Sequence, residues 1–182
     1  AGARPIKGGV PPTRNANKPR TDNLVMTKAP MTAAGYSQLQ EELRALKTVE
    51  RPAIIEAIAR AREHGDLSEN AEYHAARDRQ SFIEGRIAEL EELAKRAEVI
   101  DVSQLSGDTV LFGATVRLAD EETDKRVTYQ IVGENESDIA AGKLSISSPL
   151  ARALIGKKAK DNVEVDSPRG TRYYEIVNIK FV

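Results

Sequence analysis

Two carboxylate side chains three positions apart, Asp66 and Glu69, are the residues of this chain whose type and spacing first suggest chemistry. They follow Gly65, and glycine adopts left-handed backbone at a helix end without a steric penalty. Carboxylates are ligands that Mg²⁺ prefers, and this ion often takes only one or two of them while water or substrate phosphates complete its shell. The pair therefore indicates half of a metal site, which needs a partner to supply the other ligands.

The same spacing also fits a purely structural role at the start of a helix. Asp66 is a good N-cap, and Glu69 would then stand at the third helical position. Together they would form a capping box, in which each side chain satisfies a free backbone N–H group of the first turn. From spacing alone, the metal-binding and the capping interpretations both stay open.

Long segments with helical spacing of apolar residues flank the pair on both sides. Before it, the apolar positions are Tyr36, Leu39, Leu43, Leu46, Val49, Ile54, Ile55, Ile58 and Ala61, with Thr32 as the expected N-cap. After it, they are Tyr73, Phe82, Ile83, Ile87, Leu90, Leu93, Ala94 and Ala97. Pro52 interrupts the first segment, where we expect a kink or a stutter and not an end. The pattern predicts an antiparallel helical hairpin with arms of about 45 Å and the acids at its tip.

The remaining chain divides into a tail and a strand-rich part. Residues 1–30 contain Pro, Gly, Asn and six basic residues against one acid, so they are expected to be a disordered basic extension. Beyond residue 103, alternating apolar and polar residues predict five strands. The expected strands are 109–118, 126–132, 143–147, 162–166 and 172–182. We therefore predict two domains, a coiled-coil hairpin over 31–103 and a small α+β domain over 104–182 with a mostly antiparallel sheet.

One short helix is predicted inside the strand-rich part. Ser148 is its expected N-cap, Pro149 its first residue and Gly156 its stop signal. In this α+β arrangement the helix would cover one face of the sheet.

The composition excludes several classes of function. The 182 residues contain no Cys, which removes disulfide scaffolds, thiolate zinc sites and cysteine nucleophiles. No phosphate-binding loop or nucleophile elbow is recognisable. The absence of a long apolar run or a signal peptide predicts a cytoplasmic protein without a membrane partner.

The run 61–77 around the acids resembles the tip signature of the bacterial transcript cleavage factors, the GreA/GreB family, and is nearer to its GreA branch. Further matching motifs are 31–36, 50–52, 112–114, 131–133 and 148–157. The resemblance covers about residues 31–182, and the basic extension has no counterpart in the family pattern.

The resemblance implies that the hairpin enters the secondary channel of RNA polymerase while an FKBP-like C-terminal domain docks at the channel rim. The chain would then stimulate the polymerase's own cleavage of backtracked RNA 3′ ends, without being an enzyme itself. By the same resemblance, Asp66 and Glu69 would help to hold a Mg²⁺ ion shared with the polymerase. Arg62 and Arg77 would lie near the nascent RNA. The docking residues would be Ser148, Pro149 and Arg152, and the protein is expected to act as a monomer.

Three other functions remain open from the sequence. An inhibitory relative of the same architecture would occupy the channel without stimulating cleavage, although such relatives carry more acidic tips. A peptidyl-prolyl isomerase would need an aromatic-lined pocket, and the C-terminal part contains few aromatic residues. A coiled-coil chaperone or tether would not need acids at a glycine-containing tip.

Overall fold

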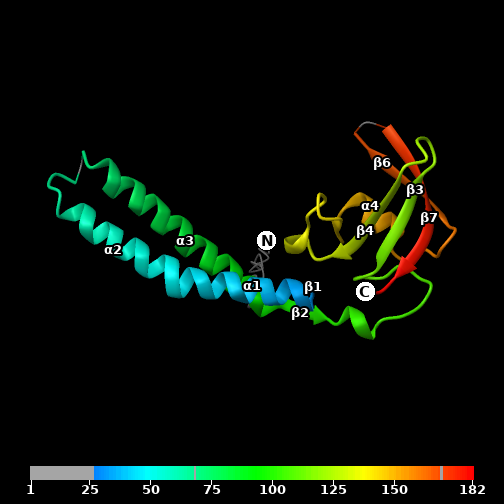
Figure 1. Cartoon of the computed structure of the whole chain (residues 1–182), viewed down its shortest axis with the longest axis horizontal. Helices are drawn as coiled ribbons and strands as arrows, with labels where there is room; N and C mark the ends of the chain where they lie inside the picture. Colours follow the sequence, from blue (N-terminus) through cyan, green and yellow to red (C-terminus); the bar gives the residue numbers. More distant parts are fainter. Residues whose placement is uncertain (1–26, 68, 169) are drawn as a thin grey trace, which may run out of the picture.

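The computed structural model describes residues 27–182 except residues 68 and 169. A helical hairpin forms one end of an elongated molecule and a sheet domain forms the other (Figure 1). Each part has its own apolar core. The hairpin core consists of Met31, Leu39, Leu46, Ile83, Ile87, Leu90 and Leu93. The sheet core consists of Val110, Ala114, Val116, Leu118, Ile131, Leu144, Ala151, Leu154, Val163 and Ile176. The predicted fold class, a helical hairpin followed by a small α+β domain, is confirmed.

The first arm runs through α1 (Ala33–Ala45), a π-helical segment η1 (Leu46–Glu50) and α2 (Arg51–Arg62). Thr32 is the N-cap of α1, because its side chain accepts a hydrogen bond from the Gly35 N–H. Pro52 stands in the first turn of α2, where a missing N–H is tolerated. The stutter expected at Pro52 is therefore the π-helical turn just before it.

The predicted apolar stripe is wrong at three positions. Val49 is 64% exposed and Ile55 is 53% exposed. Val49 lies inside the π-helical segment, whose wider turn holds an additional residue and rotates the side chains out of the α-helical stripe. Phe82 is 59% exposed because its neighbour Ile83 takes the inner position, and Phe82 lies beneath the guanidinium of Arg79 instead.

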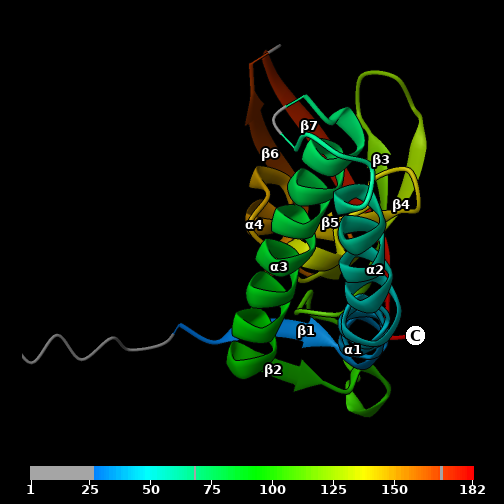
Figure 2. The same cartoon turned by 90° about the vertical axis from the view of Figure 1, so that its left-hand side faces the viewer.

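The second arm is one helix, α3 (Ala71–Arg96), which lies beside α2 (Figure 2). Beyond the apolar seam, ion pairs connect the arms: Glu42 with Arg86, Lys47 with Glu91, Glu50 with Arg79, and Arg51 with Glu84. The hydrogen bond from Arg51 lowers the pKa of the Glu84 carboxyl. Exposed pairs of this kind add little stability individually, but together they favour one register of the arms. No helix in the described part of the chain has the length and apolar character needed to cross a membrane.

Two short strands close the base of the hairpin. β1 (Ala29–Thr32) pairs in parallel with β2 (Ala97–Ile100), so that Ala29 lies opposite Ala97. The sequence assigned Ala29 and Pro30 to the disordered extension, and this is wrong for both, because they form the start of β1. The rest of that prediction falls mainly on residues 1–26, which lie outside the described residues.

The second domain is a five-stranded sheet with the order β5-β4-β3-β7-β6. Its strands are β3 (Thr115–Asp120), β4 (Arg126–Val132), β5 (Lys143–Ser145), β6 (Asn162–Ser167) and β7 (Gly170–Lys180). All neighbours are antiparallel except β4 and β5, which are parallel. The first strand begins later than predicted, because Gly113 adopts φ +82° in a turn just before it. The predicted helix is α4 (Pro149–Leu154), which contributes Ala151 and Leu154 to the core on one face of the sheet.

Candidate functional site at the hairpin tip

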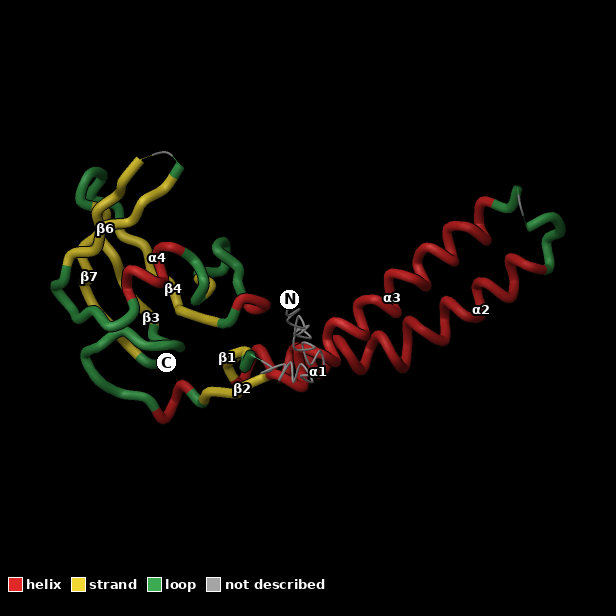
Figure 3. The backbone as a smooth tube through the Cα atoms, turned by 180° about the vertical axis from the view of Figure 1, so that it is seen from behind, coloured by secondary structure: helices red, strands yellow, loops and turns green. Residues whose placement is uncertain are grey.

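The two predicted metal ligands lie in the loop that joins α2 to α3, at the end of the hairpin away from the sheet domain (Figure 3). Asp66 and Glu69 are both exposed. The chain leaves α2 at Glu63 and reverses through Gly65, whose φ of +106° lies in the region that favours glycine. This reversal places both carboxylates at the extremity of the arm.

Asn70, and not Asp66, is the N-cap of α3. Its Oδ1 accepts a hydrogen bond of 3.0 Å from the Tyr73 N–H, and its Nδ2 donates one of 2.8 Å to the Ala61 carbonyl near the end of α2. The capping-box interpretation of Asp66 and Glu69 is therefore wrong, because both acids precede the residue at which the helix begins. Capping of α3 does not account for either carboxylate.

The sequence did indicate that Asn70 could be an N-cap, but residue spacing alone could not decide between Asn70 and Asp66. Asparagine is as good an N-cap as aspartate, and Asn70 stands directly before a helix-favouring stretch that starts at Ala71. Its second role, a bridge between the two helix ends, depends on the distance across the hairpin and has no signature in sequence spacing.

Replacing Asn70 by alanine is expected to destabilise the hairpin by about 1–2 kcal/mol. The substitution removes the cap of α3 and leaves the Ala61 carbonyl without its side-chain donor. Thermal unfolding of the full chain, followed by the helical circular dichroism signal, measures the loss. Asn70→Asp keeps the cap and loses only the donor, so it should fall between the wild type and Asn70→Ala. Equal stability of all three proteins would contradict this role.

The two arginines expected near RNA lie on different arms below the tip, and both are exposed. The guanidinium of Arg62, at the end of α2, lies 5.9 Å from the ring centroid of Tyr73. Arg77, on α3, donates a hydrogen bond of 3.0 Å to Gln80. The tip thus combines exposed carboxylates with exposed cations on both arms.

The donor set fits only a part of a metal site. Among the described residues, no group of three or more His, Asp or Glu side chains is placed to hold a metal ion. Asp66 and Glu69 offer exposed carboxylate oxygens, the hard donors that suit Mg²⁺. An ion at this tip would therefore need further ligands from another molecule.

A contact at the other end of the hairpin joins it to the sheet domain. Glu136, in the 3-10 turn η3 (Glu134–Glu136) after β4, reaches back to the start of α1. Its Oε2 accepts hydrogen bonds of 3.0 Å from the N–H groups of Thr32 and Gly133, and its Oε1 accepts one from the Thr32 hydroxyl. Since Thr32 caps α1, one carboxylate links the first helix of the arm to the sheet domain.

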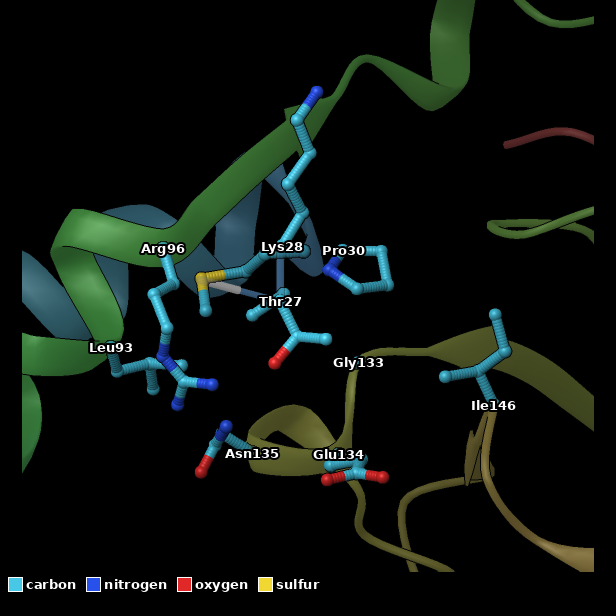
Figure 4. Close-up of a pocket in the computed structure, with 11 residues that line it drawn as sticks. Thr27, Lys28, Pro30, Leu93, Arg96, Gly133, Glu134, Asn135 and Ile146 are labelled. Carbon is cyan, nitrogen blue, oxygen red and sulfur yellow. The ribbon is translucent and has the colours of Figure 1, made fainter. Parts of the chain in front are cut away.

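The close approach of the two parts depends on glycine. A Cβ atom at Gly35 would overlap the Glu136 carboxylate, and one at Gly133 would overlap the Pro30 carbonyl oxygen. Figure 4 shows the hollow beside this contact, where the Arg96 side chain points from the base of the hairpin toward the turn that carries Asn135. We call the contact formed by Thr32, Glu136 and the two glycines the domain joint.

The predicted docking residues surround the N-terminus of α4. The Ser148 hydroxyl oxygen accepts a hydrogen bond of 3.2 Å from the Ala151 N–H, so it caps the helix. Pro149 and Arg152 are exposed, and Arg152 forms no ion pair within the described part of the chain. Ser148 thus has a structural role, and the two other side chains are accessible.

A hollow beside α4 bears on the isomerase alternative. Its described lining residues are Leu150, Val165, Ser167, Pro168, Arg172 and Tyr174. Tyr174 is the one aromatic side chain among them. An aromatic-lined prolyl pocket, which that alternative requires, is not formed by these residues.

Comparisons with known proteins cover nearly all of the described chain. The family model described as "Transcription elongation factor, N-terminal" matches residues 29–99, and the model described as "Transcription elongation factor, GreA/GreB, C-term" matches residues 105–181. Transcription elongation factor GreA from Acidiphilium cryptum is 67% identical over 156 residues, which are 86% of this chain and 99% of that protein. The same factor from Rhodospirillum rubrum is 60% identical over 156 residues, with the same coverage. The crystal structure of GreA factor homolog 1 from Thermus thermophilus is 27% identical, covers 84% of this chain and 99% of that chain, and has a TM-score of 0.39.

Proposed function

The chain belongs to the GreA/GreB family of transcription elongation factors, and from this premise we propose that its hairpin enters the secondary channel of RNA polymerase and stimulates cleavage of backtracked RNA 3′ ends. The single observation that carries the proposal is the tip. Two carboxylates are exposed at the end of a long arm, and the helix they precede is capped by another residue. Such a pair is suited to complete a metal centre that belongs to another molecule.

In this proposal, Asp66 and Glu69 hold a Mg²⁺ ion together with ligands of the polymerase. Such an ion would supply activation of the attacking water and stabilisation of the negative charge on the phosphate. The carboxylates also accept hydrogen bonds from that water and orient it. Asn70 joins the ends of α2 and α3 below the loop, so the two helix ends that present the acids are held together before binding.

The remaining residues of the proposal bind and orient the partners. Arg62 and Arg77 contact phosphates of the extruded RNA, because each is an exposed cation on the shaft below the acids. The exposed Pro149 and Arg152, presented by the Ser148-capped helix, contact the rim of the channel. The chain acts as a cytoplasmic monomer, and the catalytic centre that cuts the RNA is the polymerase's own.

A cleavage assay tests the proposal directly. A backtracked elongation complex with labelled RNA is mixed with this chain and Mg²⁺, and we expect shortened transcripts together with released 3′ fragments. Free RNA without polymerase should remain intact. If the chain instead slows transcription and releases no fragments, the inhibitory alternative holds and the cleavage proposal is wrong.

A further inference from the structure

We call the face of the sheet opposite to the apolar core its outer face. We propose that this outer face binds the phosphate backbone of duplex DNA through a cationic hollow formed by β3, β4 and β7. Six polar side chains line this hollow, which has a volume of about 380 Å³. They are Thr115, Arg117, Arg126, Thr128, Asn178 and Lys180. The proposal concerns the sheet domain alone, so it holds or fails independently of the function proposed for the hairpin tip.

The sheet register places the three cations on one diagonal. Arg117 lies opposite Thr128 of β4 and opposite Asn178 of β7. Arg126 and Lys180 each stand two residues beyond those partners, at opposite ends of the diagonal. Diagonal neighbours in a sheet have side chains about 7–8 Å apart. This is close to the separation of successive phosphates along a nucleic-acid strand.

A β-bulge brings the side chains of β7 to this face. The pairing between β3 and β7 shifts between Arg117 and Leu118, so that Asn178 lies opposite Arg117 while Ile176 lies opposite Leu118. The additional residue, Val177, changes the alternation of the strand. As a result Ile176 points into the core, and Asn178 and Lys180 still line the outer hollow.

The charges of the hollow are not compensated within the described structure. No ion pair or side-chain hydrogen bond is recorded there for Arg117, Arg126 or Lys180, whereas most arginines of the hairpin have acidic partners. No acid lines the hollow, and the acid on the same face of β7 is Glu175, opposite Ala119. Three cations that form no ion pair among the described residues, with a single diagonal acid, Glu175, beside Arg117 on β7, favour an anionic partner.

The chemistry of the lining favours the backbone of a duplex over other anions. Phosphate contacts in protein–DNA complexes come from Arg and Lys together with Ser, Thr, Asn and Gln, which are the residue types present. Single-stranded binding relies on aromatic side chains that stack on bases, and the hollow has none among its lining residues. We therefore expect sequence-independent binding to duplex DNA.

Fluorescence anisotropy of a labelled 20-base-pair duplex, titrated with the full chain at several salt concentrations, tests the assignment. The test variant replaces Arg117, Arg126 and Lys180 by glutamine. The control variant replaces Lys125, Lys157 and Lys160, which are exposed cations of the same domain outside the hollow, by glutamine. Both variants lose three positive charges and keep the basic N-terminal segment unchanged. Any binding by that segment therefore contributes equally to the two measurements.

We expect the test variant to reduce the slope of log affinity against log salt by about 2–3, which corresponds to three lost phosphate contacts. The control variant should change the slope much less. In the wild type, amide chemical shifts perturbed by the duplex should cluster on β3, β4 and β7 around the hollow. Equal losses for both variants, perturbations elsewhere, or no binding by the wild type would overturn the proposal. Competition by polyglutamate as effective as by unlabelled duplex would assign the hollow to an acidic peptide instead.

Discussion

Replacing Asp66 by asparagine is expected to lower stimulated transcript cleavage by at least about 100-fold, and Glu69→Gln should have a comparable effect. Each substitution keeps the size of the side chain and removes one negative oxygen donor. In the proposed function these donors hold the metal ion that would stabilise the charge developing in the transition state. The loss of one group that contributes to such stabilisation costs about 10²–10³ in rate. The measurement is the rate of RNA shortening in a backtracked complex at saturating protein.

The fold should not change in these variants. Asn70 caps α3, so neither acid is needed to begin the helix, and exposed substitutions away from caps usually alter stability by less than about 0.5 kcal/mol. The matched control is Glu63→Gln, which removes the same charge from an exposed position at the end of α2. Higher Mg²⁺ concentration should partly restore cleavage by Asp66→Asn. Full activity of both variants at the tip would exclude the metal-binding role.

The hairpin could be predicted because its signal is local. Burial of one stripe leaves an apolar residue every three or four positions, and this pattern located both arms and the reversal at Gly65. The details that failed depend on small changes in helical geometry. The π-helical turn before Pro52 places Val49 on the outside of the arm. Periodicity predicts that the helix is irregular there, but it does not predict which side chains then face outward.

The start of the second arm illustrates a different limit. Asp66 and Asn70 are both good N-caps, and their intrinsic preferences are almost equal. The choice is made by the loop that must connect two packed helices, because Asn70 can also donate to the Ala61 carbonyl across the hairpin. The sequence therefore predicted where the acids lie, and the capping role that it left open for them is performed by another residue.

Contacts between distant parts of the chain were not predictable from spacing. β1 and β2 are four residues each, too short for a periodic signal, and the pairing of Ala29 with Ala97 spans most of the hairpin. The bond between Thr32 and Glu136 joins residues 104 positions apart. Gly35 and Gly133 were visible in the sequence, but only the structure shows that both are needed for close approach.

The domain joint leads to the second large effect, because Glu136→Ala is expected to loosen the hairpin from the sheet domain. The substitution removes the acceptor of three hydrogen bonds and leaves the N–H groups of Thr32 and Gly133 without it, at a cost of about 2 kcal/mol. The arm is long, so a small rotation at its base moves the tip by a much larger distance. We expect stimulated cleavage to fall by about 10-fold to 100-fold, since misplacement of reacting groups by about 1 Å can cost that much.

Distance measurements separate this positioning role from a general loss of stability. The chain contains no Cys, so spin labels attached through Ala75→Cys near the tip and Glu164→Cys on β6 report the geometry of the two parts without competing thiols. Glu136→Ala should broaden the distribution of distances between the two labels. The helical circular dichroism signal of the free protein should stay the same, which shows that both parts remain folded. Glu134→Ala removes an exposed acid of the same turn and should change neither distance nor cleavage. An unchanged distribution in Glu136→Ala would show that other contacts set the direction of the arm, and any cleavage defect would then need another cause.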